Sequence, residues 1–274
     1  MPALRQYPRA GFFTGGIMVN YHTHTPRCHH AEGSEREYVA AAIEADFTTL
    51  GFSDHAPYLF PSGYVSSIRM LPEELRGYCD TILALREEFR GRIEIRLGLE
   101  MEYYPDLFAA QMDFLKDYPL EYLLLGQHAL YNEMERVYSG RPTKDPDLLR
   151  QYVDQVIEGL ETGVFTYLAH PDLINFIGSP EEYDCQMRRL CRAANRLGIP
   201  VEVNQLGLVE GKQYPNPVFW RLAAEEGVTA VLGVDAHCPA DLSDAAGREA
   251  ARQFAADCGI RLTEELTLRR VALG

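Results

Sequence analysis

Short apolar segments alternate with longer helical patterns along the chain, and this alternation constrains the fold more than any other feature. The short segments are rich in Val, Ile, Leu, Phe and Tyr and mostly lack polar alternation, which indicates strands buried on both faces. Strands that alternate with helices predict a parallel sheet with right-handed crossovers. The predicted strands are 17–21, 48–52, 93–99, 122–126, 165–169, 200–203 and 229–233.

Helix signals fill the gaps between these segments. Ser34 and Glu37 have the spacing of a capping box, and Pro72 followed by two glutamates is typical of a helix start. Gly198 and Gly227 stand just past two helical patterns, where a C-terminal cap needs a positive φ. Further helices are predicted at 145–161, 181–197, 217–226 and 248–256.

Seven strand–helix units in 274 residues favour one α/β barrel, closed or nearly closed, over an open doubly wound sheet. The Gly-rich fingerprint of a dinucleotide-binding fold is absent, and no linker or low-complexity stretch divides the chain. We therefore expect a single domain over residues 1–274. The tail from residue 260 to 274 is expected to pack across the closed end of the barrel.

Charge and cysteine content limit the class of protein. The net charge of −14 argues against stable nucleic-acid binding and against binding to an anionic membrane surface. No run of about 18 apolar residues predicts a membrane span, and residues 1–16 lack the features of a signal peptide. The six cysteines have no regular spacing. They are expected to be reduced thiols, which predicts a cytoplasmic protein.

Seven of the eight histidines, with two acids, follow the predicted strands. Because catalytic groups of α/β barrels gather at the C-terminal ends of strands, these side chains are expected to meet. One histidine at a strand end is most often a hydrogen-bonded loop residue, and His-x-His alone is a weak motif. The barrel makes the first and last strands neighbours, so that His22-x-His24 faces Asp235-x-His237, and the whole set predicts a site for several metal ions. Cys28 and Cys238 lie near these positions. For each cysteine, a role as a small residue in a tight loop is favoured over a role as a metal ligand.

These residues resemble the PHP (polymerase and histidinol phosphatase) family, over about residues 19 to 238. The resemblance implies a distorted (β/α)7 TIM-like barrel that binds two to three divalent ions, commonly zinc, iron or manganese. It leaves His29 without a counterpart. The implied metal ligands are His22, His24, His30, His55, Glu100, His128, His170, Asp235 and His237.

The histidinol-phosphatase branch of this family is the most similar, which implies hydrolysis of L-histidinol phosphate in histidine biosynthesis. Its features are Cys-x-His-Ala at 28–31, Ser-Asp-His-Ala-Pro at 53–57, Gly-Leu-Glu at 98–100, Asn-x-x-Gly-Leu at 204–208 and Asp-Ala-His at 235–237. Two departures lie where substrate would sit. Gln205-Leu206 replaces small hydroxyl residues, and Asn175-Phe176 replaces a region that often carries a basic residue.

The expected chemistry is attack of a metal-bound hydroxide on a small phosphate monoester. Glu100 is the preferred bridging ligand and Asp235 the second candidate, and Asp235 or His237 is expected to assist the leaving alkoxide through water. The expected substrate contacts are Asn204, Arg27, Arg69, Arg141 and Lys212, although a solvated surface role is equally open for each basic residue.

Three other functions compete with this hypothesis. The first is a PHP phosphoesterase that acts on a nucleotide, a sugar phosphate or an oligonucleotide end. The second is a metal-loaded protein without activity, which the complete ligand set disfavours. The third is hydrolysis of a C–N bond, which the absence of a lysine at a strand end disfavours. The sequence leaves the oligomeric state open.

Overall fold

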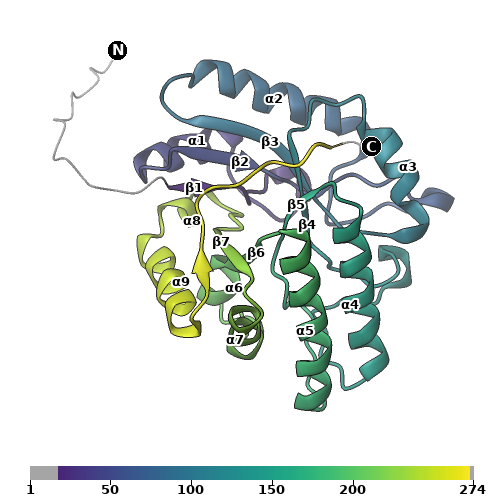
Figure 1. Cartoon of the computed structure of the whole chain (residues 1–274). Coiled ribbons are helices and arrows are strands. Elements are labelled where there is room, and N and C mark those ends of the chain that lie inside the picture. The colour runs from purple at the N-terminus through teal and green to yellow at the C-terminus, as the bar shows by residue number, and fades with distance from the viewer. Residues whose placement is uncertain (1–17, 272–274) are drawn as a thin grey trace.

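The computed structural model describes residues 18–271, in which eight parallel strands form one curved sheet in chain order (Figure 1). All seven predicted strands are present, within a few residues of their predicted ends. Residues 1–17 and 272–274, including Ile17 of the first predicted strand, lie outside the described part. The strands are β1 Val19–Asn20, β2 Thr49–Phe52, β3 Glu94–Met101, β4 Tyr122–Leu125, β5 Phe165–Leu168, β6 Val201–Asn204, β7 Thr229–Gly233 and β8 Arg261–Leu262.

Residues just beyond β1 and β7 bring the C-terminal ends of these two strands together. Thr23 and Ala236 form a parallel bridge. The amide of His24 donates to the carbonyl of Ala236 at 2.9 Å, and the amide of Ala236 donates to the carbonyl of His22 at 3.2 Å. The predicted neighbourhood of the first and seventh strands is therefore confirmed, and the barrel is distorted because these strands meet only at their C-terminal ends.

The predicted helices are all present. Ser34 and Glu37 form the expected capping box, and Gly198 caps its helix with φ +61°. The sequence did not reveal α3, α6 or α8. The helices are α1 Glu35–Glu44, α2 Leu75–Glu88, α3 Pro105–Leu115, α4 Pro146–Glu161, α5 Pro180–Leu197, α6 Gln205–Val209, α7 Pro217–Glu225, α8 Pro239–Ser243 and α9 Ala245–Cys258, with short 3-10 turns η1 Pro26–Cys28, η2 Pro61–Gly63, η3 Pro72–Glu74 and η4 Glu133–Glu135.

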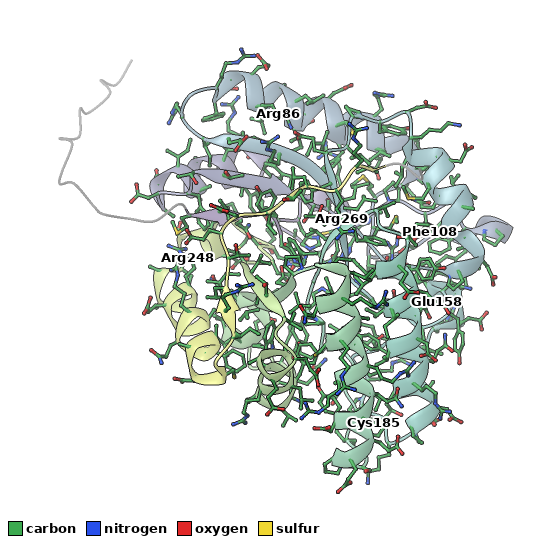
Figure 2. The ribbon with its side chains drawn as sticks, viewed as in Figure 1. Arg86, Phe108, Glu158, Cys185, Arg248 and Arg269 are labelled. Carbon is green, nitrogen blue, oxygen red and sulfur yellow. The ribbon has the colours of Figure 1, made fainter. Side chains whose placement is uncertain are left out.

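The C-terminal segment covers the end of the barrel opposite the strand C-termini. Leu266 and Leu268 pack against a small buried cluster that includes Tyr122 and Tyr167. Arg269 lies across the strands in Figure 2, and its amide donates to Thr166 Oγ1 at 3.1 Å. The expected packing of the tail is confirmed for Leu266, Leu268 and Arg269, and residues 272–274 lie outside the described part. Buried apolar side chains therefore close the end of the barrel under the C-terminal segment, and the polar side chains gather at the opposite end.

No helix within residues 18–271 is both long enough and apolar enough to cross a membrane.

Candidate metal centre

A cavity of about 430 Å³ opens at the C-terminal ends of the strands. Its floor carries imidazoles and carboxylates from different strands, and its mouth carries apolar, phenolic and charged side chains. Of the nine predicted ligands, eight line this cavity, and His22 lies buried directly beside them. The lining residues are His24, His30, His55, Ile68, Glu100, His128, Tyr138, His170, Leu173, Leu206, Glu210, Lys212, Tyr214, Asp235 and His237.

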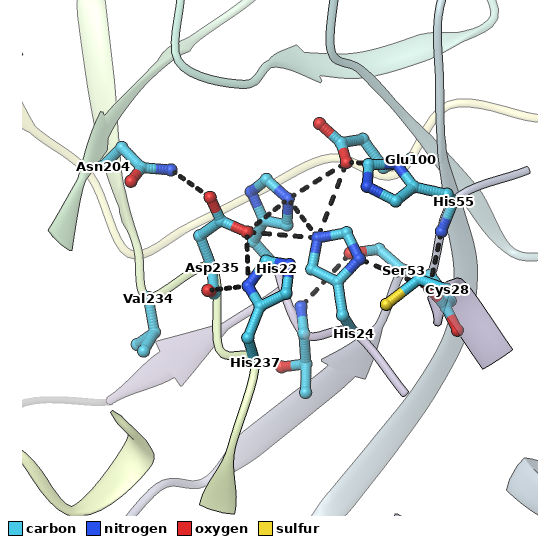
Figure 3. Close-up of polar contacts among 12 residues, drawn as sticks. His22, His24, Cys28, Ser53, His55, Glu100, Asn204, Val234, Asp235 and His237 are labelled. Atoms are coloured by element: carbon cyan, nitrogen blue, oxygen red, sulfur yellow. Dashed lines mark hydrogen bonds and ion pairs between the residues drawn. The ribbon is translucent and has the colours of Figure 1, made fainter. Parts of the chain in front are cut away.

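The ligand atoms of His22, His24 and Asp235 lie close enough together to hold one ion, and Glu100 lies beside two of them (Figure 3). The Nε2 atoms of His22 and His24 are 3.2 Å apart. Asp235 Oδ1 lies 3.3 Å from the first and 3.1 Å from the second, and Glu100 Oε2 lies 3.5 Å and 3.6 Å from the same two atoms. Ligands about 2.0–2.2 Å from a tetrahedral ion are about 3.3–3.6 Å apart, so these separations fit a metal.

Glu100 also faces three further imidazoles through its two oxygens. Its Oε2 lies 3.1 Å from Nδ1 of His55. Its Oε1 lies 2.8 Å from Nε2 of His170 and 3.5 Å from Nε2 of His128. A carboxylate with a separate group of nitrogen atoms at each oxygen has the arrangement of a ligand shared between two metal positions.

Several buried atoms of this cluster have no hydrogen-bond partner among the described residues. They are Glu100 Oε2, Asp235 Oδ1, His55 Nδ1 and His170 Nδ1. A buried polar atom without a partner costs about 1–3 kcal/mol, and more when the group is charged. The convergence of Glu100 Oε2, Asp235 Oδ1 and His55 Nδ1 on one cavity indicates a site for divalent cations, which bind such oxygen and nitrogen donors.

Backbone conformation directs two of these side chains into the cavity. Asp235 has φ +57° and His170 has φ +27°, both in the region that favours glycine. Such conformations cost about 1–3 kcal/mol for other residues and persist where the surrounding structure fixes them. Here the β7–α8 and β5–α5 connections turn sharply enough to present these side chains at the strand ends.

The electrostatics favour charged carboxylates among histidines. Burial acts to raise the pKa of Glu100 and Asp235, but the adjacent histidines hold both well below their usual range. Burial lowers the pKa of His55 to about 3 and that of His237 to about 4. The neutral rings of His55 and His237 and the ionised carboxylates of Glu100 and Asp235 are in the protonation states that bind metals.

Three buried carboxylates, Asp54, Glu102 and Glu202, lie behind the histidines, and we call them the outer carboxylates. Asp54 Oδ1 lies 3.3 Å from Nδ1 of His24, Glu202 Oε1 lies 2.8 Å from Nδ1 of His22, and Glu102 Oε1 lies 3.0 Å from Nδ1 of His128. Each contact leaves Nε2 free for a metal, because a neutral imidazole carries one proton.

Sequence reasoning missed two of the outer carboxylates. Glu102 follows Glu100 at the spacing that places both on one side of a strand, and this signal was available. Glu202 stands between Val201 and Val203 in a strand that is buried throughout. An acid inside such a strand is unusual and marks a special environment.

Of the histidines after β1, His24 and His30 line the cavity, whereas His29 does not. The His237 ring stacks on the His24 ring at a centroid distance of 4.2 Å, and the His30 ring lies 4.9 Å from that of His237. His29 is exposed and does not line the cavity. The Cys28 thiol lies close enough to His24 and His237 to share a metal position with them.

Lys212 is the one predicted basic contact that lines the cavity. Its side chain is 36% exposed, and its Nζ lies 2.9 Å from Glu210 Oε2. Arg141 is exposed and outside the lining. Arg27 is paired with Glu35 and is likewise outside. Lys212 is thus the only Lys or Arg that faces the cavity in the described part of the chain.

Arg69 and Asn204 lie behind the cavity wall. Arg69 is 2% exposed and pairs with Glu102 Oε1 at 2.9 Å and Glu133 Oε2 at 2.7 Å. Asn204 donates from Nδ2 to Glu202 at 2.9 Å and to Asp235 at 3.1 Å. Both residues are bound to internal partners, of which Glu102 contacts His128 and Glu202 contacts His22.

Residues 20–205 match the PHP domain family. A probable histidinol-phosphatase of Deinococcus radiodurans is 32% identical over 231 residues, which cover 82% of this chain and 88% of the relative. A probable phosphatase of Acetivibrio thermocellus is 25% identical over 229 residues, which cover 81% of this chain and 80% of that relative.

A solved structure supports the same fold. The histidinol phosphate phosphatase of Lactococcus lactis, in complex with zinc, L-histidinol and phosphate, has a TM-score of 0.70 at 19% identity and covers 94% of this chain and 98% of its own. At this identity the likeness concerns the fold, whereas the domain match and the Deinococcus relative establish descent. The chain belongs to the PHP family.

Proposed function

We propose that this chain is a metal-dependent phosphatase that hydrolyses L-histidinol phosphate to L-histidinol and inorganic phosphate. The observation that carries the proposal is the buried cavity in which unpartnered oxygens of Glu100 and Asp235 face imidazole nitrogens from several strands. The similarity to a probable histidinol-phosphatase supports the choice of substrate.

The proposed centre holds two to three divalent ions, either zinc, iron or manganese. Glu100 would be the ligand shared between ions, because each of its oxygens faces a separate group of histidines. Bound there, divalent ions lower the pKa of a coordinated water and neutralise charge on the phosphoryl oxygens. The proposed ligands are His22, His24, His30, His55, Glu100, His128, His170, Asp235 and His237.

The side chains around the centre have separate proposed tasks. The Lys212 ammonium lines the cavity and can bind the phosphate as a point charge. His237 is neutral at pH 7, because burial lowers its pKa to about 4, so it holds no spare proton. With Asp235 it is suited to orient a water at the leaving oxygen, and the proton that the alkoxide gains comes from that water.

A phosphatase for another small monoester is the second candidate. Leu206, which replaces a small hydroxyl residue of the histidinol-phosphatase branch, lines the cavity. Asn175 lies in the region where many members of that branch carry a basic residue. Its side-chain amide donates to the carbonyl of Gly140 at 3.2 Å. A cavity with an apolar wall and one cation is also compatible with a phosphate monoester other than histidinol phosphate.

One assay separates these possibilities. The purified protein is stripped, loaded with zinc, iron or manganese, and tested for phosphate release from histidinol phosphate, nucleotides and sugar phosphates. We expect the highest kcat/KM with histidinol phosphate, and loss of activity in Glu100→Gln. A higher kcat/KM with another monoester would favour the second candidate. A protein that binds metal and releases phosphate from none of these compounds would contradict both.

A further inference from the structure

We propose that Glu202 is a positioning residue of the metal centre, which fixes the tautomer of His22 and holds two further ligand strands in register with it. Glu202 lies on β6 and is completely buried. It does not line the cavity, so it would act through the ligands rather than on the substrate. The inference rests on the proposed metal centre and adds a residue that controls its affinity.

Four donors converge on this one carboxylate. Oε1 lies 2.8 Å from His22 Nδ1 and accepts from the Tyr167 hydroxyl at 3.2 Å. Oε2 accepts from the backbone amide of His170 at 3.1 Å and from Asn204 Nδ2 at 2.9 Å. No lysine or arginine contacts it in the described part of the chain. A buried charge without a basic partner needs such a complete set of donors.

The contact with His22 determines which ring nitrogen can bind a metal. A carboxylate accepts protons, so Nδ1 of His22 must carry the proton when it lies 2.8 Å from Glu202. In the neutral ring the lone pair is then on Nε2, the atom that faces Glu100 and Asp235. The geometry therefore assigns to Glu202 the protonation pattern that His22 needs as a ligand.

The other contacts connect Glu202 to two more proposed ligands. The amide of Asn204 bonds both Glu202 and Asp235 Oδ2, which ties β6 to the β7 end. The backbone of His170 has a left-handed conformation. Its N–H donates a hydrogen bond to Glu202, which fixes that conformation. Space for the carboxylate comes from Gly233, where an added Cβ would lie 1.7 Å from Glu202 Oε1.

Glu202→Gln tests this role at nearly constant volume. One carboxylate oxygen becomes an NH2 group, which must face at least one of the four donors. That mismatch either releases the His22 ring or displaces Asn204. Loss of such an outer partner typically lowers metal affinity about 10- to 100-fold. Glu121→Gln is the control, because Glu121 likewise accepts from several donors but is only partly buried and lies near the opposite end of the barrel.

The measurement is titration of the metal-stripped proteins with Co²⁺, followed by visible absorption and by competition with a chelator. Thermal unfolding of the stripped proteins reports folding separately. We expect Glu202→Gln to bind Co²⁺ at least about 10-fold more weakly with an altered spectrum, and Glu121→Gln to match the wild type. Wild-type affinity and spectrum in Glu202→Gln would overturn the inference and leave the proposed function standing. A wild-type protein that binds no Co²⁺ would overturn both.

A second measurement needs no variant and so does not depend on the folding of Glu202→Gln. Long-range ¹H–¹⁵N spectra of the zinc-loaded wild-type protein, labelled at histidine, report which nitrogen of each ring carries the proton. For His22 we expect a proton on Nδ1 and zinc on Nε2. A proton on Nε2 of His22 would overturn the inference.

Discussion

The carboxylate of Glu100 occupies the space that a side chain at Gly126 would need. A Cβ added to Gly126 would lie 1.9 Å from Glu100 Oε1 and 2.6 Å from its Cδ. The two residues are on neighbouring strand ends, since Glu100 pairs with Leu124 in the β3–β4 register. Gly126 therefore determines where the proposed shared ligand lies.

Gly126→Ala is expected to displace Glu100 and to lower kcat/KM for phosphate release by about 100-fold, because a misplacement of about 1 Å at a reacting centre has effects of that size. Metal content measured by elemental analysis should fall in parallel. The control is Gly77→Ala on α2, where an added Cβ meets nothing within 4 Å. Full activity and metal content in Gly126→Ala would show that Glu100 can shift without consequence.

Lys212→Met is expected to raise KM about 10-fold or more, because it removes the only lysine or arginine that lines the cavity within residues 18–271. A hydrogen bond to a charged group contributes about 1.5–3 kcal/mol, which corresponds to at least 10-fold in affinity. Arg141→Met is the matched control and should leave KM unchanged, since Arg141 lies outside the cavity lining. Steady-state kinetics of both variants show which of the two residues binds the phosphate. Equal effects would mean that bulk charge, not position, binds the phosphate.

The sequence predicted the barrel and the clustering of the ligands because both follow from strand order. Parallel strands place their C-terminal ends together, so residues such as His55 and His170 could be brought together before any distance was known. The short strand β8 was missed because two residues, Arg261 and Leu262, carry no detectable period.

The partners of individual side chains could not be predicted in the same way. Arg69 was expected as a phosphate contact, but its partners Glu102 and Glu133 come from other loops and depend on tertiary packing. Asn204 and Glu202 likewise pair with groups on different strands. Strand order fixes which ends meet, whereas the direction of each long side chain depends on its surroundings.

Arg69→Ala is expected to destabilise the protein by about 3–5 kcal/mol, because it leaves Glu102 and Glu133 without their buried cation. Glu102 also contacts His128, so metal affinity should fall as well. Urea unfolding of the metal-stripped variant measures the first effect, and chelator competition measures the second. Arg69→Lys keeps the charge but loses the bidentate geometry, so its stability and metal affinity should lie between those of the wild type and of Arg69→Ala. A raised KM with unchanged stability would instead favour a direct phosphate contact.

Metal binding at pH 7 is expected to release protons and to strengthen as the pH rises. Burial opposes the charge of His22 and His24, but neighbouring carboxylates raise the pKa of both rings well above the usual value in the metal-free protein. A protonated ring must lose a proton to bind a metal, so affinity increases with pH until these pKa values are passed. His55 and His237, with pKa values of about 3 and about 4, are already neutral and release none. Calorimetric zinc titrations in buffers of different ionisation enthalpy count the protons. A zinc affinity that is constant from about pH 6 to 8 would contradict the raised pKa values of these two rings.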